Sequence, residues 1–599
     1  MGGGISQLLR SLLTLLVFFL GLEQARGVMS LVLKSAFGTS SQLFCVSRLS
    51  ASRFHCRGHN NRPFQQRGRL LASLAPLQLE LIFDINKTIL LEDPAGGKSE
   101  QHILNEILAD HTLGIITNSG EWKCLSPDTR PNNLNGCFLP SRHRYLQSDK
   151  MLTISELSGY YGTYSDFLDY KIPDTVESLR ESKKARDKLK GRFATPQGPG
   201  AGLASILEQL RRALALPAEA AGPGCQGGED WKEAGLAGRE SWLLLPSFLE
   251  AIMELASRPD IDLLLQFRTF GTDLPRVARE WNAFCAGRHP LSRRRRRLDG
   301  SDGGRDYRIH LDQPERFGTF HRTSNSTRLV LGTLAQPDLS AHRADPEAAF
   351  AAAYLPAAND AGAGAGGQTR VLAGLSEIWA FLDPRRRGGA GDGPAGPQAG
   401  TLALRDFWPH WRLCLEAGEA GKLFLCGVGS AAAAEESDKC EYHQIFFDDN
   451  IEDDAFHIID TVFVYYNNGS VSNLSKFRSF SSEMPQTEHS RGGGEHIVAD
   501  GSGTSVKQMH TLSSSDQTSG EMWFVRPCFE NNLVKKHIVK VNPCEAVLGV
   551  GGFSAAHPSC FSQQHEGVTT ISNNFFLKNV YDRCSSLSSS LCDDDDNKE

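Results

Sequence analysis

Two short apolar segments that end abruptly in carboxylates place the strongest constraint on how this chain can fold. Residues 79–84 read Leu-Glu-Leu-Ile-Phe-Asp, and residues 445–449 read Ile-Phe-Phe-Asp-Asp. Such runs predict buried strands, and open α/β sheets bind ligands at the edge where parallel strands end. We therefore expect Asp84, Asp448 and Asp449 to form one acidic cluster, although two ordinary strand ends followed by polar turns are the alternative. Because neighbouring carboxylates repel one another, the cluster predicts a bound cation, and hard oxygen ligands favour Mg²⁺.

Hydrophobic periodicity elsewhere in the chain indicates the fold class. Apolar runs of strand length alternate with segments whose apolar residues recur at helical spacing. This alternation predicts an α/β fold built on a Rossmann-like, doubly wound parallel sheet. The expected strands are 77–83, 261–267, 327–334, 369–372, 421–426 and 443–447, and the expected helices are 99–108, 179–190, 246–255, 274–284, 375–382 and 406–415.

Composition divides the 599-residue chain into segments of different character. Its 58 glycines concentrate in tracts such as 361–367 and 388–393, which cannot bury enough apolar surface to offset the entropy of ordering. We expect these tracts to be disordered insertions on a folded core. The predicted segments are a signal peptide (1–27), a transit-like leader (28–76), a first part of the α/β core (77–120), an inserted helical unit (121–228), a second part of the core with low-complexity loops (229–465), a Ser/Gly-rich loop with a C-terminal core extension (466–583) and an acidic disordered tail (584–599).

The amino terminus has the layout of a targeting sequence. Arg10 precedes the apolar run 12–22, which is short for a transmembrane helix and is followed by small residues, so a secretory signal peptide is expected and a signal anchor is the alternative. The next segment, 28–79, contains no Asp or Glu and is rich in Ser and Arg, as transit peptides are. The two parts together resemble the leaders of proteins imported into plastids of secondary origin. Secretion, or mitochondrial import from Met29, are the alternatives, and no membrane association is expected of the mature form.

Charge and cysteine usage limit the partners and cofactors. The net charge of −7 favours neither nucleic acid nor an anionic membrane as a partner. The arginine run 293–297 could grip phosphates or act as an import address, but its Gly- and Asp-rich surroundings favour a solvated loop. The 14 cysteines include no C-x-x-C pair, so neither a zinc framework nor a dense disulfide scaffold is indicated. No feature of the sequence indicates an oligomeric state.

Four short motifs, in the order in which they occur, resemble those of a known enzyme superfamily. They are Asp84-Ile-Asn-Lys-Thr88, Thr269 after an apolar strand, Lys422, and Asp448-Asp449. The ordered set resembles the motifs of the haloacid-dehalogenase-like (HAD) phosphohydrolases, over roughly Leu77 to Asp460. The resemblance implies a HAD-like fold with residues 121–228 as a cap over the site. It also implies a Mg²⁺-dependent reaction on a small phosphorylated substrate.

The resemblance assigns chemical roles to the charged residues. Asp84 would be the nucleophile and would form an aspartyl-phosphate, as carboxylate nucleophiles do. Mg²⁺ would be held by Asp84, Asp448 and Asp449. An anionic nucleophile is repelled by a phosphoryl group unless that charge is neutralised, which the ion and Lys422 would do. Lys439 lies nearer to the acidic pair in the sequence and is the alternative to Lys422.

The same resemblance assigns residues to substrate binding. Thr88, Thr269 and Gly271, together with backbone amides after Asp84, would bind the phosphoryl oxygens through preorganised hydrogen bonds. Thr272 could take the role of Thr269, which could instead be a helix cap.

Asn86 departs from the pattern of the superfamily. The second acidic residue of the first motif normally protonates the leaving group and then activates water, and Asn86 occupies that position. An amide cannot transfer protons in this way, and such acid–base help is worth about 10²–10⁴-fold in rate. Three interpretations follow: a slow or reorganised phosphatase, a different HAD reaction, or a catalytically inactive HAD-like module that binds a ligand or partner.

Overall fold

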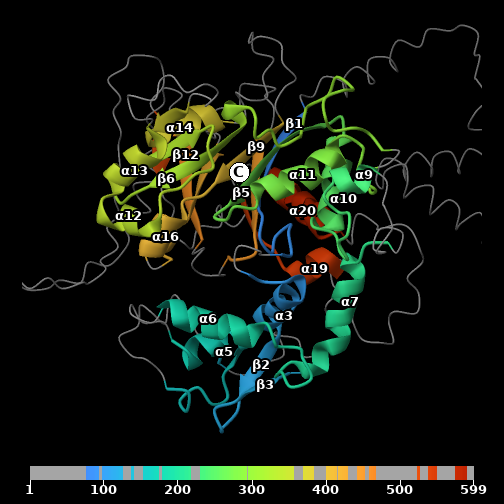
Figure 1. Ribbon diagram of the computed structural model, residues 1–599, viewed down its shortest axis with the longest axis vertical. Helices are drawn as coiled ribbons and strands as arrows, with labels where there is room; N and C mark the ends of the chain where they lie inside the picture. The colour runs from blue at the N-terminus through green and yellow to red at the C-terminus, as the bar shows by residue number, and fades with distance from the viewer. Residues whose placement is uncertain are drawn as a thin grey trace, which may run out of the picture. The chain divides into compact units, whose positions relative to one another are not determined.

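The computed structural model describes residues that all belong to one unit of the chain, Leu74–Glu599 (Figure 1). The described residues are 76–92, 97–125, 137–139, 153–173, 179–217, 229–292, 295–355, 369–383, 400–414, 416–428, 442–451, 458–466, 522–525, 537–548 and 574–589. The predicted signal peptide, almost all of the transit-like leader, the two Gly-rich tracts named above and Lys439 lie outside these residues. Within the described part of the chain, no helix combines the length and the apolar character needed to cross a membrane.

A mixed, mostly parallel sheet forms the centre of the α/β fold. Its strand order is β14-β11-β1-β5-β9-β6-β7-β8, and the six strands from β14 to β6 are parallel. The prediction of a wholly parallel sheet was wrong at one edge, where β7 is antiparallel to both β6 and β8. A short turn joins β6 to β7, whereas a parallel pair needs a long crossover connection. The strands are β1 (Leu77–Asp84), β5 (Ile261–Thr269), β6 (Phe317–Arg322), β7 (Thr327–Leu331), β8 (Arg370–Ala373), β9 (Thr401–Arg405), β11 (Tyr442–Asp448) and β14 (Ile538–Lys540).

The register of the sheet brings the two predicted acidic strand ends to one edge. Strand β1 lies between β11 and β5, and Phe83 is paired with Phe447 of β11. Asp84 and Asp448, which follow this pair, therefore end neighbouring parallel strands at the same level. On the other side of β1, Asp84 is paired with Arg268, one residue before Thr269.

Helices cover one face of the sheet. They are α10 (Pro246–Ala256), α11 (Leu274–Cys285) and α20 (Phe575–Ser589). Phe248 of α10 joins the layers, because its ring centroid lies 5.0 Å from that of Phe83 and 5.6 Å from that of Trp281 in α11. Phe576 of α20 packs against Phe83 as well, at 5.8 Å. The acidic tail predicted from residue 584 therefore begins as the end of a helix whose start belongs to the core.

The opposite face is covered by a small second sheet and one helix. The sheet has the order β10-β12-β13, with β10 at Lys422–Val428, β12 at Ile459–Tyr466 and β13 at Met522–Val525. Helix α14 (Gly374–Leu382) lies beside it and contacts β7 and β8. A doubly wound sheet carries helices on both faces, so the second sheet is a correction to the predicted architecture. Strand β10 is buried on both sides, since Leu423 packs with Leu402 whereas Phe424 packs with Ile82.

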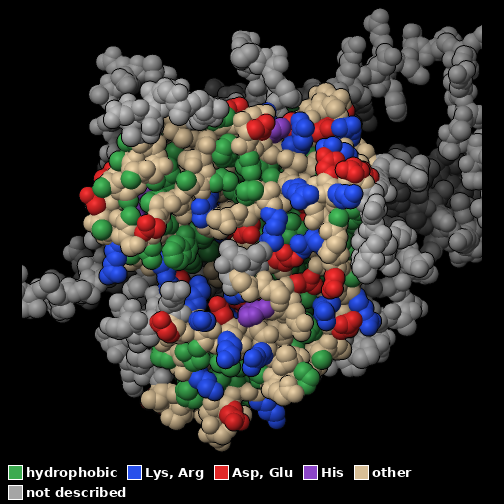
Figure 2. All heavy atoms as spheres, in the orientation of Figure 1, with side chains coloured by type: hydrophobic (Ala, Val, Ile, Leu, Met, Phe, Trp, Pro, Cys, Tyr) green, Lys and Arg blue, Asp and Glu red, His purple; other side chains and the backbone are tan. Residues whose placement is uncertain are grey.

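The segment predicted as a helical insertion contains strands as well as helices. It contains α5 (Tyr164–Lys171), α6 (Leu179–Lys190) and α7 (Ala204–Leu214), and the strands β3 (Trp122–Cys124) and β4 (Tyr161–Thr163). These two strands flank β2 (Leu113–Ile116) in an antiparallel sheet of order β3-β2-β4, so β2, which was predicted as part of the core, belongs with the insertion. Trp122 packs against Tyr164 and Phe193, with ring centroids 5.3 and 5.7 Å apart. Figure 2 shows Lys and Arg side chains gathered over α5 and α6, interspersed with Asp and Glu.

The remaining elements are short, and several were not predicted. Strands β6, β9 and β12 and helix α20 carry no expectation from the sequence. Helix α3 (Glu100–His111), predicted at 99–108, is capped by Ser99, whose side chain accepts a hydrogen bond from the His102 amide. The other helices are η3 (Ala201–Leu203), α9 (Glu229–Glu233), η4 (Pro314–Arg316), α12 (Leu339–Ala344), α13 (Pro346–Tyr354), α16 (Trp408–Leu413), η5 (Gly418–Ala420) and α19 (Pro543–Leu548).

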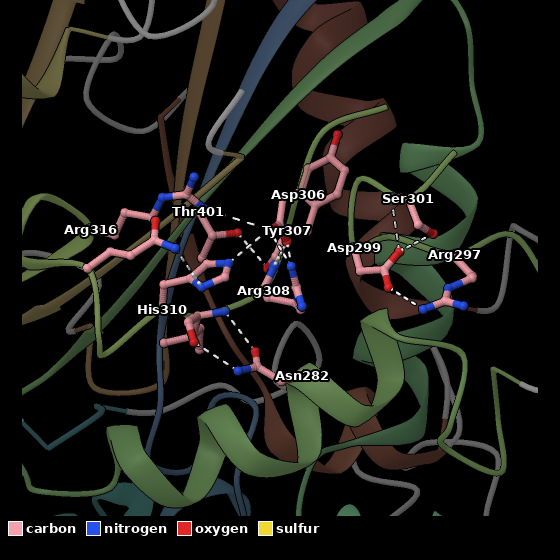
Figure 3. A network of polar contacts seen from close by, with 12 residues as sticks. Asn282, Arg297, Asp299, Ser301, Asp306, Tyr307, Arg308, His310, Arg316 and Thr401 are labelled. Atoms are coloured by element: carbon pink, nitrogen blue, oxygen red, sulfur yellow. Dashed lines mark hydrogen bonds and ion pairs between the residues drawn. The ribbon is translucent and has the colours of Figure 1, made fainter. Parts of the chain in front are cut away.

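Aspartates organise the segment that follows the arginine run. Arg296 pairs with Asp302 at 2.8 Å, and Arg297 pairs with Asp299. Further along, Asp306 accepts hydrogen bonds from Arg308 and His310, both at 2.8 Å (Figure 3). Figure 3 shows further residues of this polar network, namely Asn282, Ser301, Tyr307, Arg316 and Thr401. Arg296 and Arg297 of the run are therefore paired with neighbouring acids.

Replacement of Phe248 tests the packing of the helical face. Phe248→Ala should lower the free energy of unfolding by about 3–5 kcal/mol, because a fully buried ring is lost from the contact between α10 and the sheet. Phe138→Ala is the matched control, since that ring is 45% exposed and its loss should change stability by less than about 1 kcal/mol. Urea denaturation followed by tryptophan fluorescence measures both, and equal losses would contradict the described packing.

Candidate functional site

Three carboxylates meet at the edge of the central sheet. Asp84 ends β1, Asp448 ends β11, and Asp449 follows directly. Each offers one oxygen, and these oxygens all lie within 4.8 Å of one another. Among the described residues, this is the one group of acidic, His or Cys side chains with spacing suited to a metal ion. The structure thus brings together the three residues that the sequence analysis grouped.

Lys422 enters the cluster from the second sheet. As the first residue of β10 it is 1% exposed, and its Nζ donates to Asp84 Oδ1 and to Asp448 Oδ2, each at 2.6 Å. Burial alone would lower the pKa of the Lys422 ammonium, but the carboxylates of Asp448 and Asp84 raise it above its ordinary value. Lys422 is therefore held in its charged form between two acids.

The cluster carries more negative than positive charge. Three carboxylates and one ammonium leave a net charge of −2 when all four groups are ionised. Burial raises the pKa of Asp84 to about 7, against the lowering effect of Lys422 and with a further increase from Asp448. Burial also raises the pKa of Asp449 well above its ordinary range, against the effect of Lys87. The possible ligand atoms are all oxygens and the net charge of the cluster is negative, so it fits a hard divalent cation.

The turn after Asp84 is held by hydrogen bonds and a buried ion pair. Thr88 is fully buried, and its Oγ1 accepts a hydrogen bond from the Asp449 amide at 3.1 Å. Thr88 therefore fixes the acidic pair to the first motif, a role that the sequence analysis did not assign to it. Lys87 adopts a left-handed backbone conformation with φ of 59°, which is uncommon outside glycine. Its Nζ lies 3.0 Å from Glu106 Oε1 in α3, which anchors the turn from outside the cluster.

The second motif forms a tight local turn. Thr269 ends β5, is fully buried, and accepts a hydrogen bond from the Gly271 amide at 2.8 Å. Thr272 is exposed, which favours Thr269 as the residue of the site. A Cβ added at Gly271 would lie 2.7 Å from Asp273 Oδ2 and 3.3 Å from both Asn86 Nδ2 and Thr269 Oγ1. Gly271 is therefore required by close packing between the first and second motifs.

Asn86 and Asp273 form a pair that the sequence analysis missed. Asn86 Nδ2 donates to Asp273 Oδ2 at 3.3 Å. Asn86 Oδ1 is buried and has no hydrogen-bond partner within the described residues. Asp273 directly precedes α11, and an aspartate at that position is normally interpreted as a helix cap. Its contact with Asn86 could therefore not be predicted from the sequence.

A second buried ion pair positions Lys422. Arg268 and Asp406 are both almost fully buried and are joined by two hydrogen bonds, one of them 3.0 Å long between Arg268 Nε and Asp406 Oδ2. Arg268 Nη2 also donates to the carbonyl of Leu423 at 3.0 Å. Because Leu423 follows Lys422, this contact ties the start of β10 to the end of β5.

Comparison of the chain with family models, with curated proteins and with solved structures finds no match.

The charge imbalance predicts how pH and a divalent cation affect stability. Asp84 binds its proton more tightly in the folded than in the unfolded state, so the stability it contributes at low pH is lost as the pH rises through about 7. Between about pH 5 and about pH 8, the melting temperature should fall in EDTA, and Mg²⁺ should offset more of that fall at the higher pH. Circular dichroism melting curves measure both effects.

Two variants make this prediction specific. Asp448→Asn should abolish the stabilisation by Mg²⁺, because it removes one of the three ligands. Asp312→Asn is the control, because the Asp312 side chain is 81% exposed and distant in sequence from the cluster. An equal effect of Mg²⁺ at both pH values, or an effect that survives Asp448→Asn, would contradict a cation site at the cluster.

Proposed function

We propose that the protein is a Mg²⁺-dependent HAD-type phosphohydrolase or phosphotransferase that acts on a small phosphorylated compound through an aspartyl-phosphate. The observation that carries the proposal is the position of Lys422, whose ammonium contacts Asp84 and Asp448 beside the third carboxylate, Asp449. Such a site combines a nucleophile, a cation site and a fixed positive charge. Transfer of an anionic phosphoryl group to a carboxylate needs all three. The neighbouring parallel strands β1 and β11 support the HAD-like assignment of the fold.

Asp84 is the nucleophile in this proposal. One of its carboxylate oxygens attacks phosphorus, the bond from phosphorus to the leaving group breaks, and an aspartyl-phosphate forms. Lys422 offsets the negative charge on both the nucleophile and the incoming phosphoryl group, because it is held at 2.6 Å from Asp84. Mg²⁺, held by Asp84, Asp448 and Asp449, would supply the remaining positive charge at the phosphoryl oxygens.

Asn86 favours a second candidate function, a catalytically inactive module that binds a phosphorylated ligand or a partner. The residue keeps the site polar but cannot exchange a proton. The module would retain Lys422 and the acidic cluster as binding groups, without turnover.

Turnover and trapping experiments distinguish the two candidates. The full chain with Mg²⁺ should release phosphate from members of a phosphate-ester panel, and Asp84→Asn should reduce release to background. Wild-type protein should also incorporate labelled phosphate in a form that hydroxylamine removes, as expected of an acyl phosphate. Background release by both proteins, with Mg²⁺ shown to bind, would favour the inactive module.

Replacement of Lys422 tests the residue on which the proposal depends. Lys422→Ala should lower the rate of aspartyl-phosphate formation by about 10²-fold or more, because a preorganised charge is removed from the reacting groups. Lys578→Ala is the matched control, since Lys578 lies in α20 and pairs with Asp582 in solvent. Rapid-quench measurement of the labelled protein gives both rates, and equal rates would exclude a catalytic role for Lys422.

For localisation, we propose that residues 1–27 direct the chain into the secretory route and that residues 28–76 direct onward import into a plastid of secondary origin. The acid-free composition of residues 28–79 supports this proposal. A reporter fused to residues 1–76 should reach an organelle, whereas one fused to residues 1–27 should be secreted. Cytosolic fluorescence from both fusions would exclude it.

A further inference from the structure

Asp273 stands where an aspartate normally caps a helix, but it does not act as a cap. It is the residue before α11, is 5% exposed, and its side chain makes no capping hydrogen bond with a backbone amide of that helix. A capping aspartate elsewhere in the chain shows the contrast: Asp338 accepts a hydrogen bond from the Ala341 amide at 2.9 Å. The carboxylate of Asp273 is instead directed to Asn86, whose Nδ2 lies 3.3 Å from Oδ2.

The surroundings of Gly271 place this carboxylate beside the site residues. A side chain at Gly271 would meet Asp273 Oδ2, Asn86 Nδ2 and Thr269 Oγ1, so these three groups surround one point. They come from the first motif, from the end of β5 and from the start of α11. Asp273 is therefore next to the position at which the superfamily carries its second acidic residue.

Asn86 offers a free hydrogen-bond acceptor at the same place. Its Oδ1 is buried and has no partner among the described residues. A buried acceptor of this kind is costly unless a donor from a ligand or from water reaches it. A water molecule or a hydroxyl group bonded to Asn86 Oδ1 would lie close to Asp273, which can take up a proton as the amide cannot.

We propose that Asp273 acts as the general base in place of Asn86, and that Asn86 holds the attacking water by a hydrogen bond to Oδ1. This inference rests on the proposed function. In the second step a water oxygen attacks phosphorus of the aspartyl-phosphate, and Asp273 takes one proton from that water. The bond between phosphorus and the Asp84 oxygen breaks, which releases inorganic phosphate and restores the Asp84 carboxylate. Protonated Asp273 then returns its proton to the leaving-group oxygen of the next substrate.

Neighbouring charges indicate the step in which Asp273 matters most. Arg276 Nη2 lies 3.4 Å from Asp273 Oδ1, and Arg276 also pairs with Glu92 at 2.8 Å. Arg405 of β9 is a further cation that interacts with Asp273. Cations favour the ionised carboxylate, so Asp273 is present in the form that accepts a proton rather than in the form that donates one. Breakdown of the aspartyl-phosphate should therefore depend on Asp273 more than its formation does.

Single-turnover kinetics with the full chain, Mg²⁺ and labelled aryl phosphate test this assignment. Aryl phosphates have good leaving groups, so formation of the labelled protein needs little acid help. Asp273→Asn should leave the rate of formation within about threefold of wild type and slow its decay by about 10²-fold or more. The labelled protein should consequently accumulate. Asp338→Asn, at the exposed cap of α12, is the control and should change neither rate.

A second substitution separates a catalytic from a structural role. Asn86→Asp in the Asp273→Asn background should restore decay, because it returns a carboxylate to the first motif, whereas the same change in wild type should increase decay less. A merely structural Asp273 would slow both steps and would not be rescued. If Asp273→Asn does not fold, Asp273→Ser, which keeps a polar helix start, is measured in the same way.

The outcomes distinguish this inference from the proposed function. Labelling that depends on Asp84, with unchanged decay in the Asp273 variants, would overturn the role of Asp273 and leave the proposed function intact. An absence of labelling in wild type would overturn both, since no aspartyl-phosphate would exist for Asp273 to act on.

Discussion

The contact of one ammonium group with two carboxylates is the interaction on which the rest of the site depends. Lys422 lies between Asp84 and Asp448, and all three side chains are almost fully buried. Buried charges are tolerated only when each is compensated, because the loss of hydration is large. The Arg268–Asp406 pair supports the same arrangement, since Arg268 also donates a hydrogen bond to the backbone carbonyl of Leu423, the residue after Lys422. Two buried ion pairs thus fix the relation between the main sheet and the second sheet.

A third set of charges holds the turn that follows Asp84. Lys87 contacts Glu106 at 3.0 Å and Asp110 at 3.2 Å, both in α3. Asp110 also pairs with Lys190 of α6, at 3.0 Å. The turn after Asp84 is therefore joined, through one helix, to the segment that the resemblance to HAD enzymes assigns to a cap. Movement of that segment would displace the backbone amides beside Asp84.

The sequence was sufficient to predict the acidic cluster but not its surroundings. An apolar run that ends in a carboxylate identifies a strand end, so the convergence of Asp84 and Asp448 could be predicted from two local patterns. Lys422 could be placed only by order along the chain, because it starts a strand of a separate sheet. Asp273 could not be identified, since an acid before a helix has the same pattern whether or not it caps. Strands as short as β9 and β4 contain too few residues to show a periodic pattern of apolar side chains.

The long sequence separation within the site has a consequence for how the protein reaches its active form. Lys422 and Asp84 are 338 residues apart, and the two strands that carry the acids are neighbours despite a similar separation. Contacts of this kind form late, because the entropy of closing long loops must be overcome first. An incompletely synthesised or unfolded chain therefore contains Asp84 without Lys422 or Asp448 beside it. The buried cluster therefore exists only once the whole core has folded.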